Sequence, residues 1–488
     1  MKIRLLLLCF FCSQALFAQF FVNSGAVVGI GAGAIVTVKN MDFENLGDLS
    51  HAGDLEVGGN ITNSQIWVCD PAQLSHISLT SDWFNNASFN PGIGKVSFNG
   101  TNQNMGGTAQ THFHKLALLG SGSTSKTLLN TVWCADSFYL NDAELATNGN
   151  TFSLRNGGIP IQKSAGYIST FKRGIVQMVY PAPYGGNSVI PLGMGPAASQ
   201  YKPFYLINPA QDSFNMILFD HSPTLDGLNA ATLQDSLCNI NENYFYQLQT
   251  FGSPVYFGVT QSLSEQQYSK LVNWNGSQWD KLSNSGPSPV IAGDNLALNA
   301  WVANRTQYIS MGMEKPFVSL GPDFSLVRGA SLMLNPVGYF PKGANFLWDP
   351  ASDLSCSYCQ NPVFTMGTPG TLTLKVSNGP NCEASGSVTI ISKGDYNNNI
   401  PNAFTPNSDL LNEGFGPVLL PGDKLVNLEI YDRWGGKIYE GAERWDGSFM
   451  GQPVMPGVYF YQMSIQSSLS TSKFGTHFYI SGNVTVLR

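Results

Sequence analysis

His112 and His114 are the one close pair among the six histidines of this 488-residue chain. Because side chains alternate across a strand, both imidazoles would face the same way and could bind a metal ion. No third ligand is evident nearby, and protein metal sites use three or more. We therefore expect surface or turn histidines here rather than a metal site.

Carboxylates near the N-terminus could take part in polysaccharide chemistry. Asp48, Asp54 and Glu56 would line one face of a repetitive β structure, although acidic side chains at turns are normally solvated. A polysaccharide lyase also needs a basic group. The basic residues considered do not cluster in the sequence: Lys39, Lys95, Lys115 and Arg155. A structure that gathered them beside Asp48 and Asp54 would favour a carbohydrate-active protein.

Motifs for nucleophilic catalysis or nucleotide binding are not found in the sequence. The run Gly120-Ser121-Gly122-Ser123 lacks the G-x-S-x-G spacing, and neither a Walker loop nor a dinucleotide fingerprint occurs. A Ser-His-Asp triad stays open, because its members converge only in space. We predict that the protein is not an enzyme and has no catalytic, cofactor-binding or metal residues.

The spacing of Cys356 and Cys359 fits either redox chemistry or a local disulfide. A redox C-x-x-C gains reactivity from a helix N-terminus, whereas loop residues flank this pair. A zinc site would need a second pair of ligands, and only Cys382 is nearby. We expect a structural disulfide between Cys356 and Cys359. The pairing of the other cysteines stays open: Cys69, Cys134, Cys238 and Cys382.

The segment from Trp274 to Trp279 predicts a hairpin, because Asn275-Gly276 supplies the two positive-φ residues of a tight turn. The two tryptophans could form a platform for sugar stacking or could pack across the strands. We favour cross-strand packing.

Composition points to an all-β protein. Charged residues make up only 12% and hydrophobic residues 43%, with 51 Gly and 27 Pro. This balance opposes coiled coils, helical repeats and charge-rich disorder, and it favours short strands joined by tight turns. A formal net charge of −7 leaves no basic surface for phosphate backbones. Nucleic-acid binding is therefore disfavoured.

Residues 1–18 have the pattern of an export signal. Lys2 and Arg4 form a positive region, Leu5 to Phe11 is apolar, and Ala18 ends a signal-peptidase site. The apolar run is too short to span a membrane, and no later segment approaches a spanning length. We expect cleavage before Gln19 and a mature chain without a transmembrane segment.

Four β-rich regions follow the signal. Residues 19–165 run in short strands that each bury two or three side chains, which predicts a β-solenoid or β-helix, with a plain sandwich as the alternative. An imperfect echo of Leu46-Gly47-Asp48-Leu49 six residues later supports repetition. Residues 166–314 predict a β-sandwich, because well separated strands end at turn signals. Residues 83–89 and 96–100 resemble the solenoid-like N-terminal regions of large Bacteroidota surface proteins, and residues 189–193 and 201–206 resemble a linking module of the same proteins.

Residues 315–393 predict a small sandwich with a buried Trp348 on a central strand. Leu372, Leu374 and Val376 alternate with polar residues and would complete its core. With its cysteine-containing segments, this region resembles the PKD-like, immunoglobulin-like modules of Bacteroidota exported proteins. That resemblance implies a spacer role.

Residues 394–488 predict a compact antiparallel sandwich. Val426 to Ile430 alternate cleanly, Asp432 to Gly436 form a turn, and Lys437 to Glu440 return as the second strand of a hairpin. Pro456-Gly457 fits a type II turn before the aromatic strand Val458 to Tyr461.

The same residues resemble the type B sorting domain of the type IX secretion system, also called the gliding-motility-associated C-terminal domain. The family's opening matches Ile400 to Asn407, and its final strand matches Gly482 to Arg488. Three ordered blocks lie between these ends. The sorting motif residues are Pro406, Asn407, Tyr431, Arg433, Trp434, Gly435, Trp445, Asp446, Gly447, Pro456, Gly457, Val458 and Tyr459.

One loop departs from the family pattern. The family places Gly-Asp-Gly after Pro-Asn, and such an oxygen-rich loop could bind Ca²⁺. This chain has Ser408 to Glu413 instead, without either glycine. We expect Asn407, Asp409 and Asn412 to make turn hydrogen bonds, with Ca²⁺ binding the less favoured alternative.

The resemblance implies export across the inner membrane and recognition of the C-terminal domain by outer-membrane type IX secretion machinery. We expect a cell-surface or secreted protein with an adhesin-like or envelope-structural role, and a surface glycan or protein as its ligand. The alternative is a carbohydrate-binding or polysaccharide-degrading protein whose site lies on the N-terminal solenoid.

Overall fold

The computed structural model describes residues 20–488 apart from a set of short gaps. The gaps are residues 121–123, 157–160, 196, 198–199, 283–285, 288–296, 303–304, 328, 368, 394–399, 420–421 and 467–476. The expected signal peptide at residues 1–18 lies outside the described part. The all-β prediction is confirmed, because the described helical segments are single 3-10 turns. The chain divides into two compact units that meet at residues 314 and 315.

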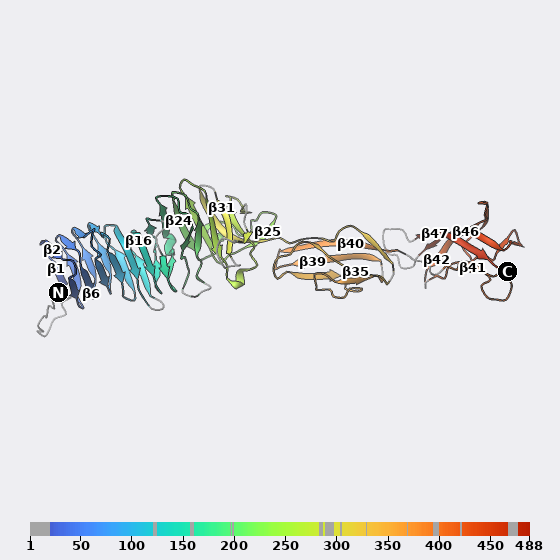
Figure 1. The fold of residues 1–488 in the computed structure, drawn as a ribbon, viewed down its shortest axis with the longest axis horizontal. Coiled ribbons are helices and arrows are strands. Elements are labelled where there is room, and N and C mark those ends of the chain that lie inside the picture. The colour runs from blue at the N-terminus through green and yellow to red at the C-terminus, as the bar shows by residue number, and fades with distance from the viewer. Residues whose placement is uncertain are drawn as a thin grey trace. The chain divides into compact units, whose positions relative to one another are not determined.

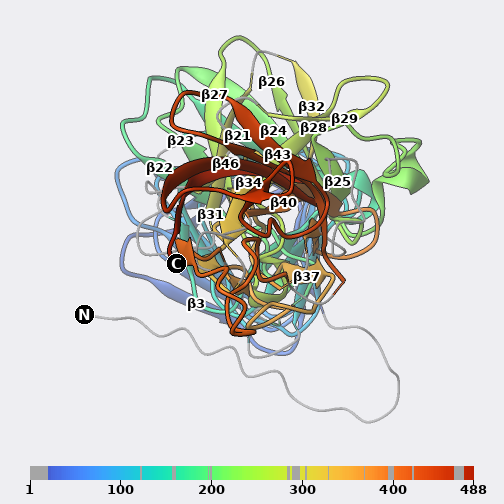
Figure 2. The ribbon, with the colours of Figure 1, turned by 90° about the vertical axis from the view of Figure 1, so that its right-hand side faces the viewer.

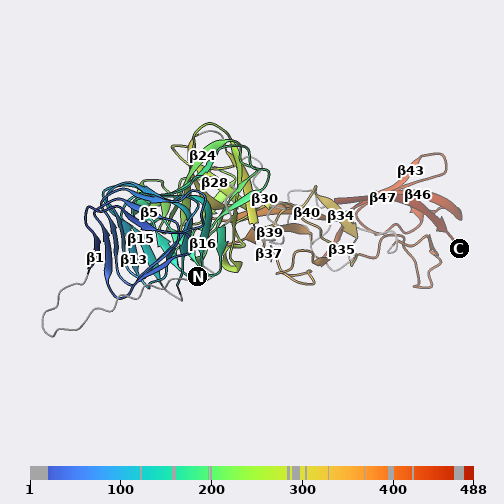
Figure 3. The ribbon, with the colours of Figure 1, turned by 60° about the vertical axis from the view of Figure 1, so that its left-hand side comes forward.

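The N-terminal region is a parallel β-solenoid with strands on three faces (Figures 1 and 3). The first face consists of β1 (Phe20–Asn23), β4 (Asp42–Asn45), β7 (Ile61–Asn63), β10 (Trp83–Asn85), β13 (Gln103–Gly106), β15 (Ser125–Leu128), β17 (Glu144–Ala146) and β20 (Tyr167–Ser169). The second, shorter face consists of β2 (Val28–Ile30), β5 (Leu49–His51), β8 (Trp67–Cys69) and β11 (Phe89–Asn90). The solenoid expected from the short strands is confirmed.

The third face begins the largest sheet of the protein. Its solenoid strands are β3 (Ile35–Val38), β6 (Asp54–Val57), β9 (His76–Leu79), β12 (Lys95–Phe98), β14 (Thr111–Leu118), β16 (Val132–Leu140), β18 (Thr151–Leu154) and β21 (Ile175–Tyr180), with β19 (Ile161–Lys163) also paired to β16. Alternate side chains point inward, and their aromatic rings stack from rung to rung. Trp67 and Trp83 are fully buried with ring centroids 5.7 Å apart. This continuous interior lets two or three inward side chains stabilise each short strand.

A ladder of buried asparagines runs along one corner of the solenoid. Asn23 donates to Asn45, Asn45 to Asn63 and Asn63 to Asn85, through Nδ2 to Oδ1 bonds of 2.8–2.9 Å. Asn63 Nδ2 also donates to the Ser88 carbonyl at 3.1 Å. The ladder fixes the register between successive rungs, because each buried side-chain amide finds its hydrogen-bond partner in the asparagine of the next rung.

We expect Asn63→Ala to destabilise the solenoid by about 2 kcal/mol, because Asn45 Nδ2 loses its 2.9 Å acceptor and Asn85 Oδ1 loses the amide that donates to it in the buried ladder. Hydrogen–deuterium exchange of peptides covering residues 43–89 would report the change. The matched control is Asn99→Ala at an exposed position. Equal exchange in the two variants would contradict a structural role for the ladder.

Parallel pairing continues beyond residue 165, the boundary expected from the sequence. Glu144 of β17 pairs with Tyr167, and Thr151 of β18 pairs with Ile175. The other edge of β21 then pairs in antiparallel fashion with β24 (Asp212–Phe219). The solenoid passes into the next module through one shared sheet, which covers an edge that would otherwise be open.

The rest of the first unit packs two antiparallel sheets (Figure 2). After β24 the shared sheet contains β26 (Phe245–Thr250), β32 (Thr306–Glu314), β28 (Lys270–Trp274) and β29 (Trp279–Lys281), with β25 (Leu237–Ile240) also paired to β32. The other sheet contains β22 (Asn187–Ile190), β23 (Phe204–Ile207), β27 (Val255–Thr260), β31 (Ala297–Val302) and β30 (Gly286–Pro287). The 3-10 turns are η1 (Phe171–Arg173), η3 (Pro223–Asp226) and η4 (Leu263–Glu265).

The second unit begins with a small sandwich. Its strands are β33 (Phe317–Ser319), β34 (Phe324–Val327), β35 (Ser331–Met333), β36 (Val337–Tyr339), β37 (Asn345–Asp349), β38 (Val363–Thr365), β39 (Gly370–Ser377) and β40 (Glu383–Lys393). Trp348 is 1% exposed and packs with Leu372, Leu374 and Val376, as expected. Its strand β37 lies at the edge of the sheet order β34-β40-β39-β37, so the expected central position was wrong. The indole is buried by the sandwich interior and by the loop that follows its strand.

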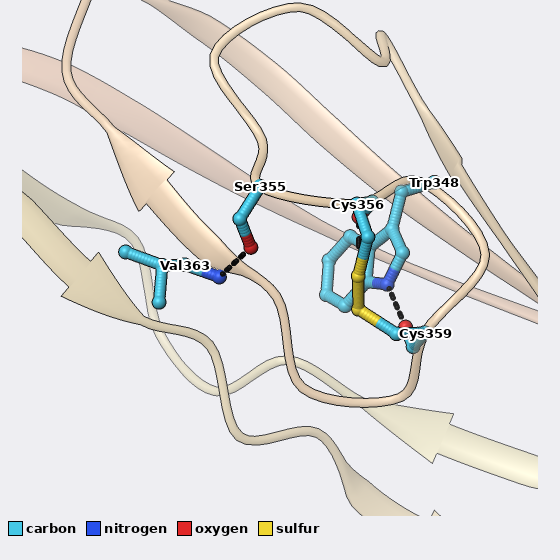
Figure 4. Close-up of a disulfide and its surroundings, with 5 residues drawn as sticks. All are labelled: Trp348, Ser355, Cys356, Cys359 and Val363. Carbon is cyan, nitrogen blue, oxygen red and sulfur yellow. Dashed lines mark hydrogen bonds between the residues drawn. A yellow bond between two sulfur atoms is a disulfide. The ribbon is translucent and has the colours of Figure 1, made fainter.

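That loop contains a disulfide between Cys356 and Cys359 (Figure 4). Trp348 Nε1 donates to the Cys359 carbonyl at 2.9 Å, and the Val363 amide donates to Ser355 Oγ at 2.9 Å. The disulfide therefore closes a loop that covers the buried tryptophan. By contrast, Cys69 and Cys134 are buried free thiols of the solenoid.

Replacing Cys356 and Cys359 together with serine should lower the stability of this module by about 2 kcal/mol. The effect is at the low end for a disulfide because a cross-link across a short loop removes little conformational entropy from the unfolded chain. Exchange of the Trp348 indole proton, followed by NMR, would measure the loss. A decrease as large as that of a core truncation would mean that the loop contributes more than the loop-closure argument allows.

The C-terminal domain is built on a five-stranded sheet. Its strands in sheet order are β41 (Ala403–Phe404), β47 (His477–Val486), β46 (Gly457–Gln466), β42 (Lys424–Tyr431) and β43 (Lys437–Gly441). One face of this sheet is covered by loops and by the small hairpin of β44 (Ser448–Phe449) and β45 (Gln452–Pro453). The core between them includes Phe404, Phe415, Leu428, Ile430, Trp445, Met463, Ile465 and Val484.

Candidate functional site

The turn between β42 and β43 is held in one conformation by an aspartate. Asp432 Oδ1 accepts hydrogen bonds from the backbone amides of Trp434 and Gly436, each at 2.8 Å. Gly435 has φ of +82°, a left-handed conformation that favours glycine. The Arg-Trp-Gly block of the sorting motif is therefore a rigid turn with a defined shape.

The two large side chains of this turn point into solvent. Trp434 is 86% exposed, and Arg433 is also exposed. An indole with so little contact does not contribute to the core of its own domain. Exposed tryptophan and arginine are the residue types that most often anchor protein interfaces.

A charged network borders the turn on the outer face of the sheet. Glu429 accepts hydrogen bonds from the Tyr431 hydroxyl at 2.7 Å and from Lys437 Nζ at 3.2 Å. These two bonds lower the pKa of Glu429, with Tyr431 the larger cause. Lys437 also pairs with Glu440 at 2.7 Å, and the bonds to Glu440 and Glu429 raise the pKa of Lys437. The network links β42 to β43 beside the turn.

Two other motif residues, Trp445 and Gly447, are buried and shape the domain. Trp445 is 0% exposed, its ring lies 5.5 Å from Phe404, and its Nε1 donates to the Ser448 carbonyl at 2.9 Å. Asp446 Oδ1 accepts from the Ser448 amide at 2.9 Å. At Gly447, with φ of +73°, a Cβ would lie 2.9 Å from Pro406 Cγ. Trp445 and Gly447 therefore serve packing, and Asp446 fixes the turn that follows them.

The third block forms the turn into β46. Tyr459 donates from its hydroxyl to the Met455 carbonyl at 2.8 Å, across Pro456 and Gly457. Its ring also packs edge-on against Trp445, with centroids 5.4 Å apart. Val458, on the opposite face of the strand, is 51% exposed. The sorting motif thus combines the buried Trp445 and Gly447 with exposed positions that include Val458 and the turn at Arg433 and Trp434.

The loop that departs from the family pattern makes turn hydrogen bonds at Asn407 and Asp409, as expected. Asn407 Oδ1 accepts from the Asp409 amide at 3.1 Å, and Asp409 Oδ1 accepts from the Leu411 amide at 2.8 Å. The bond from Leu411 is the main cause that lowers the pKa of Asp409. Glu413 accepts from the amides of Ser408 and Leu410, each at 3.0 Å. The carboxylates considered for Ca²⁺ therefore bind amides of their own loop; Asn412 contributes its carbonyl, which accepts from the Thr405 amide.

The histidine pair lies on β14 without a shared metal geometry. The His112 ring stacks on Trp133 at 3.9 Å, and the Arg155 guanidinium covers the same indole at 3.4 Å. Burial lowers the pKa of His112, and Arg155 adds to that effect. Among the residues that the structure describes, no group of three His, Cys, Asp or Glu side chains could hold a metal ion.

Trp274 and Trp279 are directly opposite each other on β28 and β29. Their rings meet edge to face at 5.8 Å, and Trp279 is 0% exposed. The cross-strand packing favoured from the sequence is confirmed, and Trp279 offers no ring face to a sugar.

A row of ionisable side chains crosses the outer surface of the solenoid. Asp54 pairs with His76, His76 with Lys95, and Lys95 with Lys115, on successive strands from β6 to β14. His76 was not recognised in the sequence, although the spacing of 19–22 residues between these positions is that of one rung. Burial lowers the pKa of His76, and Lys95 adds to that effect. Glu56 lies on the same face, bonded to Thr37 at 3.2 Å.

The other residues that the sequence suggested for polysaccharide chemistry lie away from this row. Asp48 precedes β5 on another face, where its carbonyl accepts from the Asn23 side chain. Lys39 follows β3, and Arg155 stacks on Trp133. The structure thus brings together Lys95, Lys115 and Asp54, but not the full set considered from the sequence.

Comparison with known families identifies the C-terminal domain. Residues 398–480 match the CHU_C Type IX secretion signal domain. The predicted sorting domain is confirmed. The type IX secretion signal implies delivery by that system to the cell surface or beyond, and contact with its machinery. No described helix is long and apolar enough to cross a membrane.

No curated protein matches the chain. Among solved structures, DIP-gamma IG1+IG2 is 11% identical with a TM-score of 0.17, covering 35% of this chain and 96% of that one. Titin domains I67–I69 are 11% identical with a TM-score of 0.18, covering 49% and 94%. The Bacteroides ovatus protein SGBP-B, in complex with a mixed-linkage heptasaccharide, is 10% identical with a TM-score of 0.14, covering 56% and 81%. Likenesses this distant carry no argument about function.

Proposed function

We propose that this is a non-enzymatic surface or secreted protein whose type IX secretion signal domain is recognised through the exposed turn at Arg433 and Trp434. Export would begin with cleavage of the signal peptide at residues 1–18 and would end at the cell surface or in the medium. The single observation that carries the recognition step is the exposed Trp434 on a turn fixed by Asp432.

Contrast within the sorting motif supports this assignment. Trp445 is fully buried and has a packing role, whereas Trp434 has no packing role that would account for its presence. Burial of an exposed indole in a partner's pocket releases water from a large apolar surface, and an adjacent arginine adds charge-assisted hydrogen bonds. The turn therefore has the chemistry of an interface anchor.

The upstream region is proposed to act in adhesion or envelope architecture. Polar side chains of the solenoid form hydrogen bonds between successive rungs. Asp42 Oδ1 accepts from the Asn60 amide at 2.7 Å, and Asp82 Oδ1 accepts from the Asn104 amide at 2.7 Å. Such ladders make a stiff head that presents its outer faces to a surface glycan or protein.

A strain lacking the protein would test the adhesive role. Cells of the producing bacterium should attach less to an abiotic surface and to each other when the gene is deleted, and the full chain should restore attachment. Growth on polysaccharides should be unchanged. Normal attachment combined with a loss of polysaccharide use would overturn the adhesive proposal and favour a carbohydrate-active protein.

The row from Asp54 to Lys115 supports a second candidate function. Two lysines and a histidine on one outer face could bind and act on an acidic polysaccharide, with a basic group that removes a proton. Incubation of the mature protein with polygalacturonate, followed by detection of unsaturated products, would test this candidate. Product formation that is lost in Lys95→Ala would establish it, whereas the absence of product would leave the adhesive proposal as the only candidate.

A further inference from the structure

A cavity of about 430 Å³ lies in the first unit, where the last solenoid rungs meet the end of β24. Its size falls within the range of small-molecule sites. Its lining includes Glu144 of β17, Phe171 of η1, and Phe219 and His221 at and just after the end of β24. Thr170 connects the segment before η1 to β24, because its hydroxyl donates to the Leu218 carbonyl at 2.6 Å and accepts from the Leu218 amide at 2.9 Å.

The backbone at this cavity adopts an unfavourable conformation. Lys172 and Arg173 are consecutive non-glycine residues with φ of +55° and +62°. An ion pair between Arg173 and Asp226 holds the segment in place. The result is that Phe171 is 59% exposed beside the cavity, with Lys172 Nζ 5.5 Å from its ring. Left-handed residues of this kind are concentrated at ligand sites, where the surrounding structure holds them.

Polar groups of both signs surround the cavity. Glu144 accepts a hydrogen bond from the Ser169 hydroxyl, and Lys172 brings a positive charge to the same lining. His221 lies between two carboxylates, with Nε2 3.2 Å from Asp226 and Nδ1 3.6 Å from Asp220. The lining holds two carboxylates, Glu144 and Asp220, and two basic side chains, Lys172 and Arg173, so it gives no net attraction for a polyanion. These side chains do offer donors and acceptors for hydroxyl groups, while an exposed aromatic ring offers an apolar face.

We propose that this cavity binds a neutral saccharide. Phe171 would contact the apolar face of a sugar ring, Glu144 would accept hydrogen bonds from its hydroxyls, and Lys172 would donate to them. The site is separate from the row on β6 to β14 and from the exposed turn of the signal domain. It therefore gives the proposed surface protein a specific ligand class without requiring an enzymatic step.

Calorimetric titration of the mature full-length protein would test the proposal. The probes are four neutral hexasaccharides: cellohexaose, maltohexaose, mannohexaose and chitohexaose. We expect at least one to bind, and we expect Phe171→Ala and Glu144→Gln each to weaken its binding about tenfold or more. The matched control is Phe251→Ala, which removes another exposed phenylalanine. Phe251 follows Thr250, the last residue of β26, and Thr250 pairs with Phe214 near the start of β24, whereas the cavity lies at the end of β24. The control should bind as the unaltered protein does.

Three results would overturn the proposal. The first is no binding of any of the four probes at millimolar concentration. The second is binding that both cavity variants leave unchanged. The third is binding lost in Lys95→Ala and retained in Phe171→Ala, which would place the sugar on the outer row of the solenoid. Because Phe171 is exposed, its truncation leaves the core intact, and the test does not depend on a variant that fails to fold.

Discussion

Trp445→Ala should unfold the signal domain and abolish delivery of the protein to the cell surface. The indole is fully buried, packs against Phe404 and Tyr459, and donates to the Ser448 carbonyl. Removing a tryptophan from such a core costs about 3–5 kcal/mol, which is a large part of the stability of a small domain. Hydrogen–deuterium exchange over residues 400–488 would measure the unfolding, and protease accessibility on intact cells would measure delivery.

Trp434→Ala is the matched control for that variant. It removes the same side chain from an 86% exposed position, so exchange in the domain should stay close to that of the unaltered protein. Delivery should nevertheless fall, because losing an interface tryptophan typically costs about 2 kcal/mol, or about 30-fold in affinity. If Trp434→Ala were delivered at the normal level, the exposed turn would not be the recognition site.

Acidification from pH 6.5 to pH 4 should destabilise the solenoid by about 3 kcal/mol through His51. The side chain is 1% exposed, and burial lowers its pKa from 6.5 to about 4. The unfolded chain takes up a proton near pH 6.5, whereas the folded chain does so only near pH 4. The stabilising contribution is therefore complete above pH 6.5, falls through this window, and is absent below it.

Denaturation of the solenoid at several pH values, monitored by exchange over residues 43–69, would show this dependence. His51→Leu supplies the control, because it keeps an apolar volume at the position and removes the titrating group. The slope between pH 6.5 and pH 4 should be shallower in the variant; His76 and His112, whose pKa values are also lowered by burial, would account for part of the remainder. An unchanged slope would mean that His51 does not control acid stability.

The order of the modules could be predicted from the sequence because each has a local signature. Alternating apolar residues and Gly-rich turns identify strands, and the hairpin from Val426 to Glu440 is present in the structure as β42 and β43. The sorting motif identified the C-terminal domain because buried residues such as Trp445 and turn residues such as Gly435 are both required by its fold. Residues that the fold requires occur in a fixed order along the chain, so they can be recognised from the sequence.

Features that depend on rung register were not predictable. The six-residue echo in the sequence connects β5 and β6, which belong to one rung, whereas paired residues of successive rungs are 18–24 positions apart. The ladder residues Asn23, Asn45 and Asn63 therefore have unequal spacings, and His76 could not be aligned with Lys95. Turns of variable length between strands conceal the repeat until the strands are paired.

Division of the motif into buried and exposed residues also required the structure. Trp434 and Trp445 are equivalent as letters in the sequence, yet one is 86% and the other 0% exposed. The cavity beside η1 was missed for a related reason. Its lining comes from β17, η1 and the end of β24, which are far apart in the chain, and Lys172 and Arg173 give no sign of positive φ in the sequence.

Deletion of the signal domain tests the central claim most directly. The full-length protein and a chain ending at Lys393 should be produced in the same type IX-competent bacterium and followed by protease accessibility on intact cells and by the amount in the medium. We predict that the shortened chain is retained in the periplasm, while the full chain and a full-length Phe460→Ala control, altered at an exposed residue outside the sorting motif, are delivered. Delivery of the shortened chain to the surface or the medium would contradict the assignment of residues 394–488 as the export signal.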